Sequence, residues 1–253
     1  MSPPRREIYQ RPLIFHGFDA VAAIRHPKKL YDSPVNLKGA PPERFGSVSA
    51  LFYRLWAEPT LAPLHRRVGA EVPIEKGRLL DIGCGPGRLD RLLAATWPDL
   101  SVVGLDESPG MLRQAAKGPN PSNLEFRLGL LEEADFDETF DFALSVLSFH
   151  HWEDPEGGLA AAHRALRPGG RLWIYEPDPE AESSVLRSDY APLWGFLSLP
   201  LWICRAGFRG HGFSQKEAEE VVRPAVERSS FGEMTVSRRG STLRFELTKN
   251  GAR

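Results

Sequence analysis

Three glycines in five residues follow a short apolar run, in the sequence LLDIGCGPGR that spans residues 79–88. Glycine lets a backbone turn tightly and approach a ligand without an intervening side chain. Nineteen residues after Gly87, a second apolar run ends at Asp106. A carboxylate at the end of a second strand can accept hydrogen bonds from both hydroxyls of a ribose. The pattern therefore predicts a site for a cofactor that contains a nucleoside.

The spacing of the glycines separates two classes of cofactor. A dinucleotide-binding loop has the spacing G-x-G-x-x-G, and here Arg88 stands in place of its third glycine. The observed spacing is G-x-G-x-G, with Asp81 two residues before the first glycine. This spacing disfavours a dinucleotide, and the loop need not hold a pyrophosphate. The alternatives are a dinucleotide site and a tight turn that binds nothing.

Two adjacent histidines, His150 and His151 in the run SFHHWED, are candidates for proton transfer. Neutral imidazole near physiological pH can accept a proton from a reacting group. The alternative is that one ring packs against Trp152 and the other is solvated. Three near-neighbours rarely converge on one ion without a distant ligand, so we expect no metal site at His150, His151 and Asp154.

An alternation of strands and helices must position these residues. Apolar runs separated by helical periodicity predict an α/β fold, a doubly wound and mostly parallel sheet with helices on both faces. Pro168, Gly169 and Gly170 are expected to form a sharp break between a helix and a strand. The expected strands are Arg78–Ile82, Ser101–Leu105, Leu124–Leu128, Phe140–Val146 and Arg171–Glu176, and the expected helices are Arg88–Thr96, Met111–Lys117 and Pro155–Leu166.

The two ends of the chain differ from this alternating region. Residues 1–44 are rich in proline and basic residues, which predicts a loosely structured N-terminal arm before a domain over residues 45–253. That domain should begin with two helices between Phe45 and Glu71. Near the C-terminus, Ser214 is the expected N-cap of a helix through Arg228, with a kink or early stop at Pro224. A hairpin of strands follows, Glu233–Arg238 and Thr242–Thr248.

The bulk composition restricts the class of protein. Of 253 residues, 42% are hydrophobic and 26% charged, and the formal net charge is -1. A normal core is expected, and no general attraction to nucleic acid phosphates. Two cysteines at no metal-binding spacing indicate a reducing compartment. The uncharged run at residues 191–204 is too short to span a bilayer, so we expect a cytoplasmic protein with no membrane span.

Residues 79–176 resemble the class I S-adenosylmethionine-dependent methyltransferases, especially the group that acts on small molecules. The matching stretches are LLDIGCGPGR, VVGLDESPGMLRQA, FDFALSVLSFHHWEDP and AHRALRPGGRLWIYEP. The resemblance implies a Rossmann-like seven-stranded sheet with an antiparallel last strand, and S-adenosyl-L-methionine as the cofactor. It also implies that the segment over residues 183–213, dense in aromatic residues, is a lid over the substrate. A packed helix pair and a dimer contact are the alternatives.

The resemblance also implies roles for single residues. The backbone from Gly83 through Cys84 to Gly85 would face the methionine part of the cofactor, with Asp81 nearby. Asp106 would bind the ribose. The remaining contacts would be Glu107 and Met111 beside the adenine, and the backbone oxygen of Ser145 at the methionine amino group.

Two positions depart from that pattern or leave it open. Many relatives carry Gly-Asp after the third strand, and here the run is Gly129-Leu130-Leu131-Glu132. Leu130 cannot accept the adenine amino group through its side chain, so the backbone amides of Leu130 and Leu131, or Glu132, would make that contact. Tyr53 would line the substrate pocket, or else pack in the core. His151 corresponds to a histidine that assists catalysis in some phosphobase N-methyltransferases.

These observations favour methyl transfer to an oxygen, nitrogen or carbon of a small, partly apolar or aromatic molecule. A nucleic acid or protein methyltransferase is the second hypothesis. The near-neutral charge disfavours it, and Ser145-Val146-Leu147-Ser148 stands where an Asn/Asp-Pro-Pro-aromatic run would be expected. A non-catalytic S-adenosylmethionine-binding protein is the third. The sequence does not indicate an oligomeric state.

Overall fold

The structure is a computed structural model that describes residues 58–190, 212–231 and 233–250. The predicted N-terminal arm, Tyr53 and residues 191–211 of the predicted lid lie outside the described residues. Within the described ranges, none of the helices combines the length and the apolar character that crossing a membrane requires.

Seven strands form one sheet in the order β3-β2-β1-β4-β5-β7-β6. Strands β1 to β5 pair in parallel, and β7 lies antiparallel between β5 and β6. The predicted doubly wound sheet with a reversed last strand is therefore confirmed. The strands are β1 (Gly77–Ile82), β2 (Leu100–Asp106), β3 (Leu124–Leu128), β4 (Phe140–Val146), β5 (Leu166–Pro177), β6 (Thr235–Arg239) and β7 (Thr242–Thr248).

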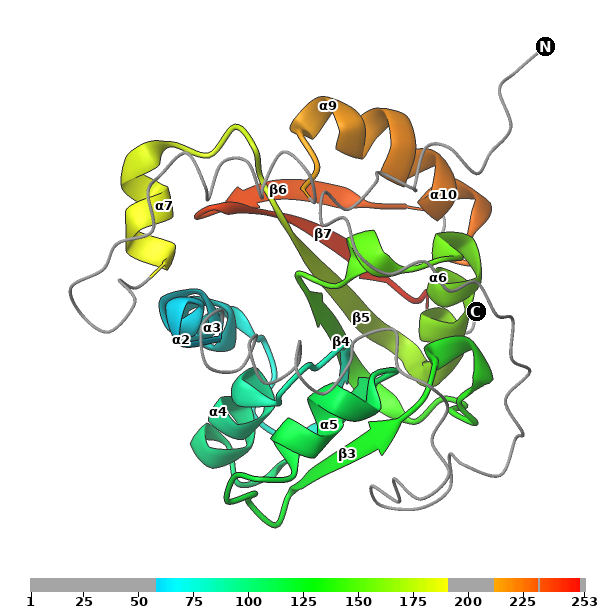
Figure 1. Cartoon of the computed structure of the whole chain (residues 1–253). Helices are drawn as coiled ribbons and strands as arrows, with labels where there is room; N and C mark the ends of the chain where they lie inside the picture. The colour runs from blue at the N-terminus through cyan, green and yellow to red at the C-terminus, as the bar shows by residue number, and fades with distance from the viewer. Residues whose placement is uncertain (1–57, 191–211, 232, 251–253) are drawn as a thin grey trace, which may run out of the picture.

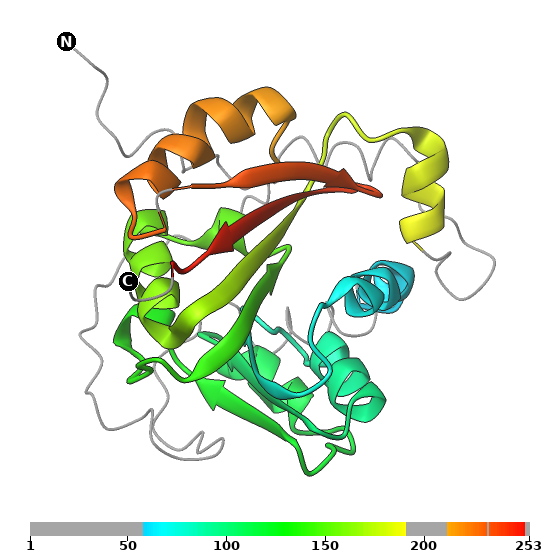
Figure 2. The ribbon, with the colours of Figure 1, turned by 180° about the vertical axis from the view of Figure 1, so that it is seen from behind.

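Helices cover both faces of this sheet (Figures 1 and 2). One face packs against α3 and α4 through a cluster that includes Leu79, Phe142 and Trp173. The other packs against α6 and α10 through a cluster that includes Leu80 and Ile174. The helices are α2 (Glu58–Thr60), α3 (Ala62–Glu71), α4 (Arg88–Thr96), α5 (Pro109–Ala115), α6 (Pro155–Ala165), α7 (Ser183–Asp189), α9 (Gln215–Glu217) and α10 (Arg223–Arg228).

The start of β5 differs from the sequence prediction. The predicted break at Pro168, Gly169 and Gly170 is wrong, because the strand begins at Leu166, directly after α6. Backbone hydrogen bonds between this segment and Lys249, 2.9 Å to the Gly169 nitrogen and 2.8 Å to the Gly170 oxygen, keep it attached to the sheet. The irregularity is taken up inside the strand as a register shift against β4 and a positive φ of 79° at Gly169.

The C-terminal helical segment begins as predicted and passes through its proline. Ser214 caps it in a capping box, in which its hydroxyl accepts from the Glu217 nitrogen and the Glu217 carboxylate accepts from the Ser214 nitrogen. The expected early stop at Pro224 is wrong, because α10 continues through it to Arg228, and a π-helical turn, η5 (Ala218–Val222), precedes α10. A wider turn is one way for a helix to accommodate the hydrogen bond that proline cannot donate.

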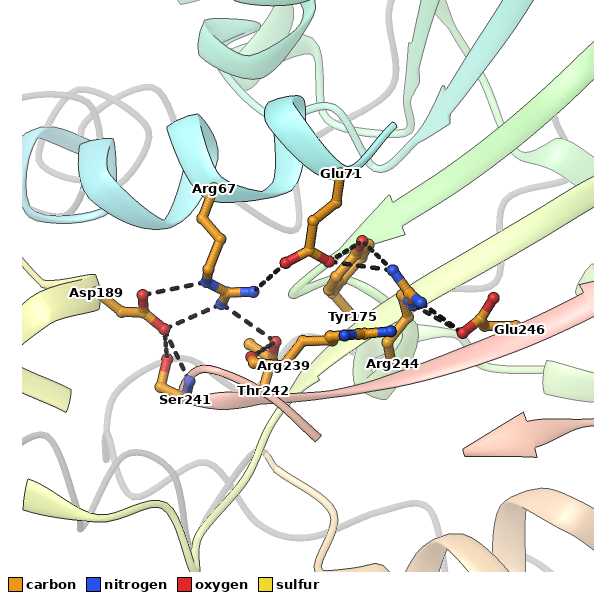
Figure 3. Close-up of polar contacts among 9 residues, drawn as sticks. All are labelled: Arg67, Glu71, Tyr175, Asp189, Arg239, Ser241, Thr242, Arg244 and Glu246. Carbon is orange, nitrogen blue, oxygen red and sulfur yellow. Dashed lines mark hydrogen bonds and ion pairs between the residues drawn. The ribbon is translucent and has the colours of Figure 1, made fainter. Parts of the chain in front are cut away.

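A polar network joins α3 to α7 and to the β6–β7 hairpin (Figure 3). Arg67 donates to Asp189 at 2.9 Å, and the same carboxylate oxygen of Asp189 accepts from the backbone and hydroxyl of Ser241, each at 2.7 Å. One turn along α3, Glu71 accepts from the Tyr175 hydroxyl at 3.0 Å and from Arg244 at 3.1 Å. Since these partners are far apart in sequence, the network fixes α3 against the far half of the sheet.

Candidate functional site

The glycine loop connects β1 to α4 at the carboxyl end of the sheet. The backbone nitrogens of Gly83 and Cys84 both donate to the Leu105 oxygen of β2, at 2.8 and 3.1 Å. A Cβ at Gly83 would lie 1.9 Å from the Ser148 hydroxyl, whereas a Cβ at Gly85 would have no atom within 4 Å. The loop is thus packed closely on one side and presents the Gly85 backbone to open space, as a bound ligand requires.

Asp106 ends β2 beside this loop. One of its carboxylate oxygens accepts from the Gly85 nitrogen at 2.8 Å, and the other accepts from the Ser108 nitrogen at 2.8 Å. Burial raises the pKa of Asp106 to about 6, although the two backbone hydrogen bonds favour its ionised form. The structure therefore brings together the loop and the acid that the sequence singled out separately.

Two buried carboxyl groups lie behind the loop. Asp81 and Asp90 are 3% and 0% exposed, and three of their four carboxyl oxygens receive no hydrogen bond from any third residue that the structure describes. Burial, followed by the charge of Asp90, raises the pKa of Asp81. Burial likewise raises the pKa of the Cys84 thiol, so this side chain is a neutral neighbour of the pair. Two adjacent carboxyl groups can bond to each other only when one carries a proton.

The residues expected beside an adenine gather next to Asp106. Glu107 is exposed, and Met111 is buried in the first turn of α5, where its nitrogen donates to the Ser108 hydroxyl at 3.3 Å. The loop after β3 is attached to β2, because the Gly129 nitrogen donates to the Asp106 backbone oxygen at 3.0 Å. Leu130 then stands 37% exposed and Leu131 is buried. An exposed apolar side chain thus stands at the position where the family resemblance would imply a carboxylate.

The chain leaves β4 through a strained turn. Ser145 is fully buried, and its hydroxyl has no hydrogen-bond partner among the described residues. Leu147 has a positive φ of 55°, which is rare for a residue other than glycine. Its nitrogen donates to the Tyr175 oxygen at 2.8 Å, which holds the turn against β5. The next residue, Ser148, is the one that packs against Gly83.

The two histidines occupy different environments in η4, a 3₁₀ helix (Phe149–His151). His150 Nδ1 lies 2.6 Å from a carboxylate oxygen of Glu176, which is completely buried. His151 is exposed, and the two rings are 4.0 Å apart between centroids. Which of them acts as a base stays a prediction, as do the contacts expected of the other candidate residues.

Two polar residues near the site, Glu176 and Asp90, were not singled out by the sequence reasoning. Each stands where the period of its element calls for an apolar residue. Glu176 follows Leu172 and Ile174 on one buried face of β5, and Asp90 is buried beside Leu89 and Leu93 on α4. A charge at a core-facing position is the signal that would have found both. Within the described ranges, no three metal-binding side chains lie close enough together to hold an ion.

Comparison with known proteins places this geometry in a family. A family profile described as "Methyltransferase domain" matches residues 80–174. The demethylmenaquinone methyltransferase of Thermus thermophilus is 34% identical over 197 residues, which cover 74% of this chain and 84% of that protein. The chain belongs to the class I S-adenosylmethionine-dependent methyltransferases. The open backbone at Gly85 and the carboxylate of Asp106 fit the cofactor of this family.

Other relatives match this chain over shorter stretches. The malonyl-[acyl-carrier protein] O-methyltransferase of Acetivibrio thermocellus is 35% identical over 94 residues, 37% of this chain and 33% of that protein. The chain spans about a third of the length of the first curated relatives that it matches. A crystal structure of an S-adenosylmethionine-dependent methyltransferase from Aquifex aeolicus shares the fold, with a TM-score of 0.56 at 17% identity, over 81% of this chain and all of that one.

Proposed function

We propose that this methyltransferase transfers the methyl group of S-adenosyl-L-methionine to an oxygen, nitrogen or carbon nucleophile of a small, partly apolar or aromatic molecule. The observation that carries the proposal is the contact between the glycine loop and Asp106, made by the Gly85 nitrogen at 2.8 Å. It puts a turn with an accessible backbone and a carboxylate at the carboxyl ends of two adjacent parallel strands, where α/β sheets bind nucleotides.

The cofactor supplies a methyl group that a positively charged sulfur has already activated. The protein therefore has to bind the cofactor and the acceptor, align them and exclude water. It also has to take a proton from the acceptor where the acceptor carries one. In this proposal Asp106 accepts from the ribose hydroxyls, Leu130 and Met111 border the adenine, and the loop from Gly83 holds the methionine part.

Two observations support a small acceptor. The proteins that match this chain include enzymes named for the small molecules demethylmenaquinone and trans-aconitate. The formal net charge of -1 gives no general attraction to a polyanion.

Calorimetric titration with S-adenosyl-L-methionine tests the assignment of the cofactor site. Asp106→Ala removes a charged acceptor of two hydrogen bonds, so we expect affinity to fall by about 10- to 100-fold. Because the ribose hydroxyls favour the ionised carboxylate, wild-type affinity should rise as the pH increases through about 6.

The matched control is Asp99→Ala, an exposed carboxylate next to the opposite end of β2, which should bind like the wild type. Equal affinity of Asp106→Ala and Asp99→Ala would rule out the assignment. The acceptor class is tested by incubation with methyl-labelled cofactor and a metabolite extract. We expect labelled small molecules that survive nuclease and protease treatment of the extract, whereas label that disappears with either treatment would support a macromolecular acceptor.

A further inference from the structure

Glu176 is a carboxylate at the end of an otherwise apolar row. On β5, Leu172, Ile174 and Glu176 alternate onto the face that packs against α6 and α10, and all three are fully buried. A carboxylate buried in this way is costly unless hydrogen bonds satisfy both of its oxygens. The partners of Glu176 therefore indicate what the residue is for.

Both partners come from one short segment. The Phe149 nitrogen donates to Oε1 of Glu176 at 2.8 Å, and His150 Nδ1 lies 2.6 Å from Oε2. The parallel pairing of β4 with β5 brings them together, since Val146 and Tyr175 are register partners just before the two segments. Ser148, which precedes Phe149, packs against the glycine loop at Gly83. Glu176 thus fixes the position of η4 beside the proposed cofactor site.

The same contacts determine which ring nitrogen of His150 carries the proton. A carboxylate that already accepts a backbone N–H is an acceptor toward its second partner as well. Neutral His150 must then carry its hydrogen on Nδ1 and donate it to Glu176, which puts the ring's lone pair on Nε2. His151 has an exposed ring 4.0 Å away, and it shares neither hydrogen bond.

We propose that Glu176 is a positioning residue that presents Nε2 of His150 as the base of the methyl transfer, so that His150, and not His151, takes the acceptor's proton. The inference rests on the proposed function. Nε2 accepts the proton of the acceptor's O–H or N–H. The acceptor atom uses its electron pair to bond the methyl carbon, and the carbon–sulfur bond breaks with its pair remaining on sulfur. Glu176 then stabilises the imidazolium that forms.

Nuclear magnetic resonance of ¹⁵N-histidine-labelled protein tests the tautomer without any acceptor. The neutral His150 of the wild type should carry its hydrogen on Nδ1. In Glu176→Gln the amide oxygen still has to accept from the Phe149 nitrogen, so the amide N–H would donate to Nδ1 and move the ring hydrogen to Nε2. A wild-type His150 with its hydrogen on Nε2 would overturn the proposal.

Turnover with methyl-labelled cofactor and a metabolite extract tests the role in catalysis. Glu176→Gln and His150→Gln should each lose product on the order of 10²- to 10⁴-fold, while cofactor affinity stays within about threefold of the wild type and shows that the variants are folded. His163→Gln is the matched control, because His163 lies on α6 with its ring packed against Phe231, and this variant should keep wild-type turnover.

The outcomes distinguish the inference about Glu176 and His150 from the proposed function. A larger loss in His151→Gln than in His150→Gln, or full turnover in Glu176→Gln, would overturn this inference and leave the proposed function intact. Absence of labelled product with the wild type would overturn the proposed function and the base role together, whereas the tautomer of His150 would still be measured.

Discussion

Asp81 and Asp90 form a pair of buried carboxyl groups that the fold holds at a cost. Both lie behind the glycine loop with almost no exposure, and burial raises the pKa of each. A carboxyl group whose pKa is raised on folding contributes stability below its unfolded pKa, near 4, and loses it as the pH rises through the folded pKa. The pair should therefore make the protein less stable at alkaline than at mildly acidic pH.

Replacing one member of the pair tests this dependence. Asp90→Asn removes one titrating group and gives Asp81 an amide donor. We expect the fall in unfolding free energy between about pH 5 and 8, up to about 1.4 kcal/mol per pH unit for one proton, to become shallower. Urea unfolding across that range measures it, with the exposed Asp99→Asn as the control. Parallel pH profiles for wild type and Asp90→Asn would contradict the raised pKa values of this buried pair.

At the scale of elements, the glycine loop and the turn after β4 form one packed unit. Gly83 has a φ of 78°, and a Cβ there would overlap the Ser148 hydroxyl at 1.9 Å. A side chain at position 83 would therefore meet two penalties, backbone strain and overlap with Ser148. The close approach links the loop proposed to bind the cofactor to η4, the 3₁₀ helix that carries the histidines.

The two contributions at Gly83 can be separated by mutation. Gly169 has a nearly identical φ of 79° and nothing within 4 Å of an added Cβ. Gly169→Ala should therefore cost only the backbone strain, about 1–2 kcal/mol. Gly83→Ala should cost about 2–5 kcal/mol, because the overlap adds to the strain. Urea unfolding compares them, and equal losses would show that Ser148 moves aside freely.

At the scale of the whole molecule, α3 is attached to the far side of the sheet by polar contacts. Asp189 on α7 accepts from Arg67 on α3 and from Ser241 in the β6–β7 turn. Burial raises the pKa of Asp189, but the hydrogen bonds from Arg67 and Ser241 outweigh it and hold that pKa below its usual value. A carboxylate of this kind contributes stability above about pH 4 and loses it as the pH falls through its lowered pKa.

Asp189→Asn is expected to destabilise the protein by about 1–3 kcal/mol at pH 7, because it weakens charge-assisted bonds in a buried place. The difference from the wild type should shrink between pH 7 and about pH 3, because acidification brings the pH toward the lowered pKa of Asp189 and protonation removes its charge. The control is Glu219→Gln, which breaks an exposed ion pair to Arg223 and should cost less than about 1 kcal/mol. Thermal unfolding at pH 7 and at about pH 3 measures this difference. A loss of stability that is the same at both pH values would contradict the expectation.

The helices and strands that depend on the pattern of neighbouring residues were predictable from the sequence alone. The bounds of α4 (Arg88–Thr96), β3 (Leu124–Leu128) and β4 (Phe140–Val146) agree with the expected ranges. Apolar periodicity and a glycine turn act within a few residues, so the chain itself encodes them. The juxtaposition of Asp106 with the loop was also predictable, because adjacent parallel strands end at the same edge of a sheet.

What only the tertiary structure decided is which buried polar groups meet. The sequence shows Glu176 at the end of a strand and two equivalent histidines, and nothing local distinguishes His150 from His151. Their difference arises because β4 pairs with β5 in a particular register, which puts the carboxylate against Nδ1 of one ring across 26 residues. Hydrogen bonds between distant segments depend on register and side-chain direction, and those are set by packing of the whole sheet.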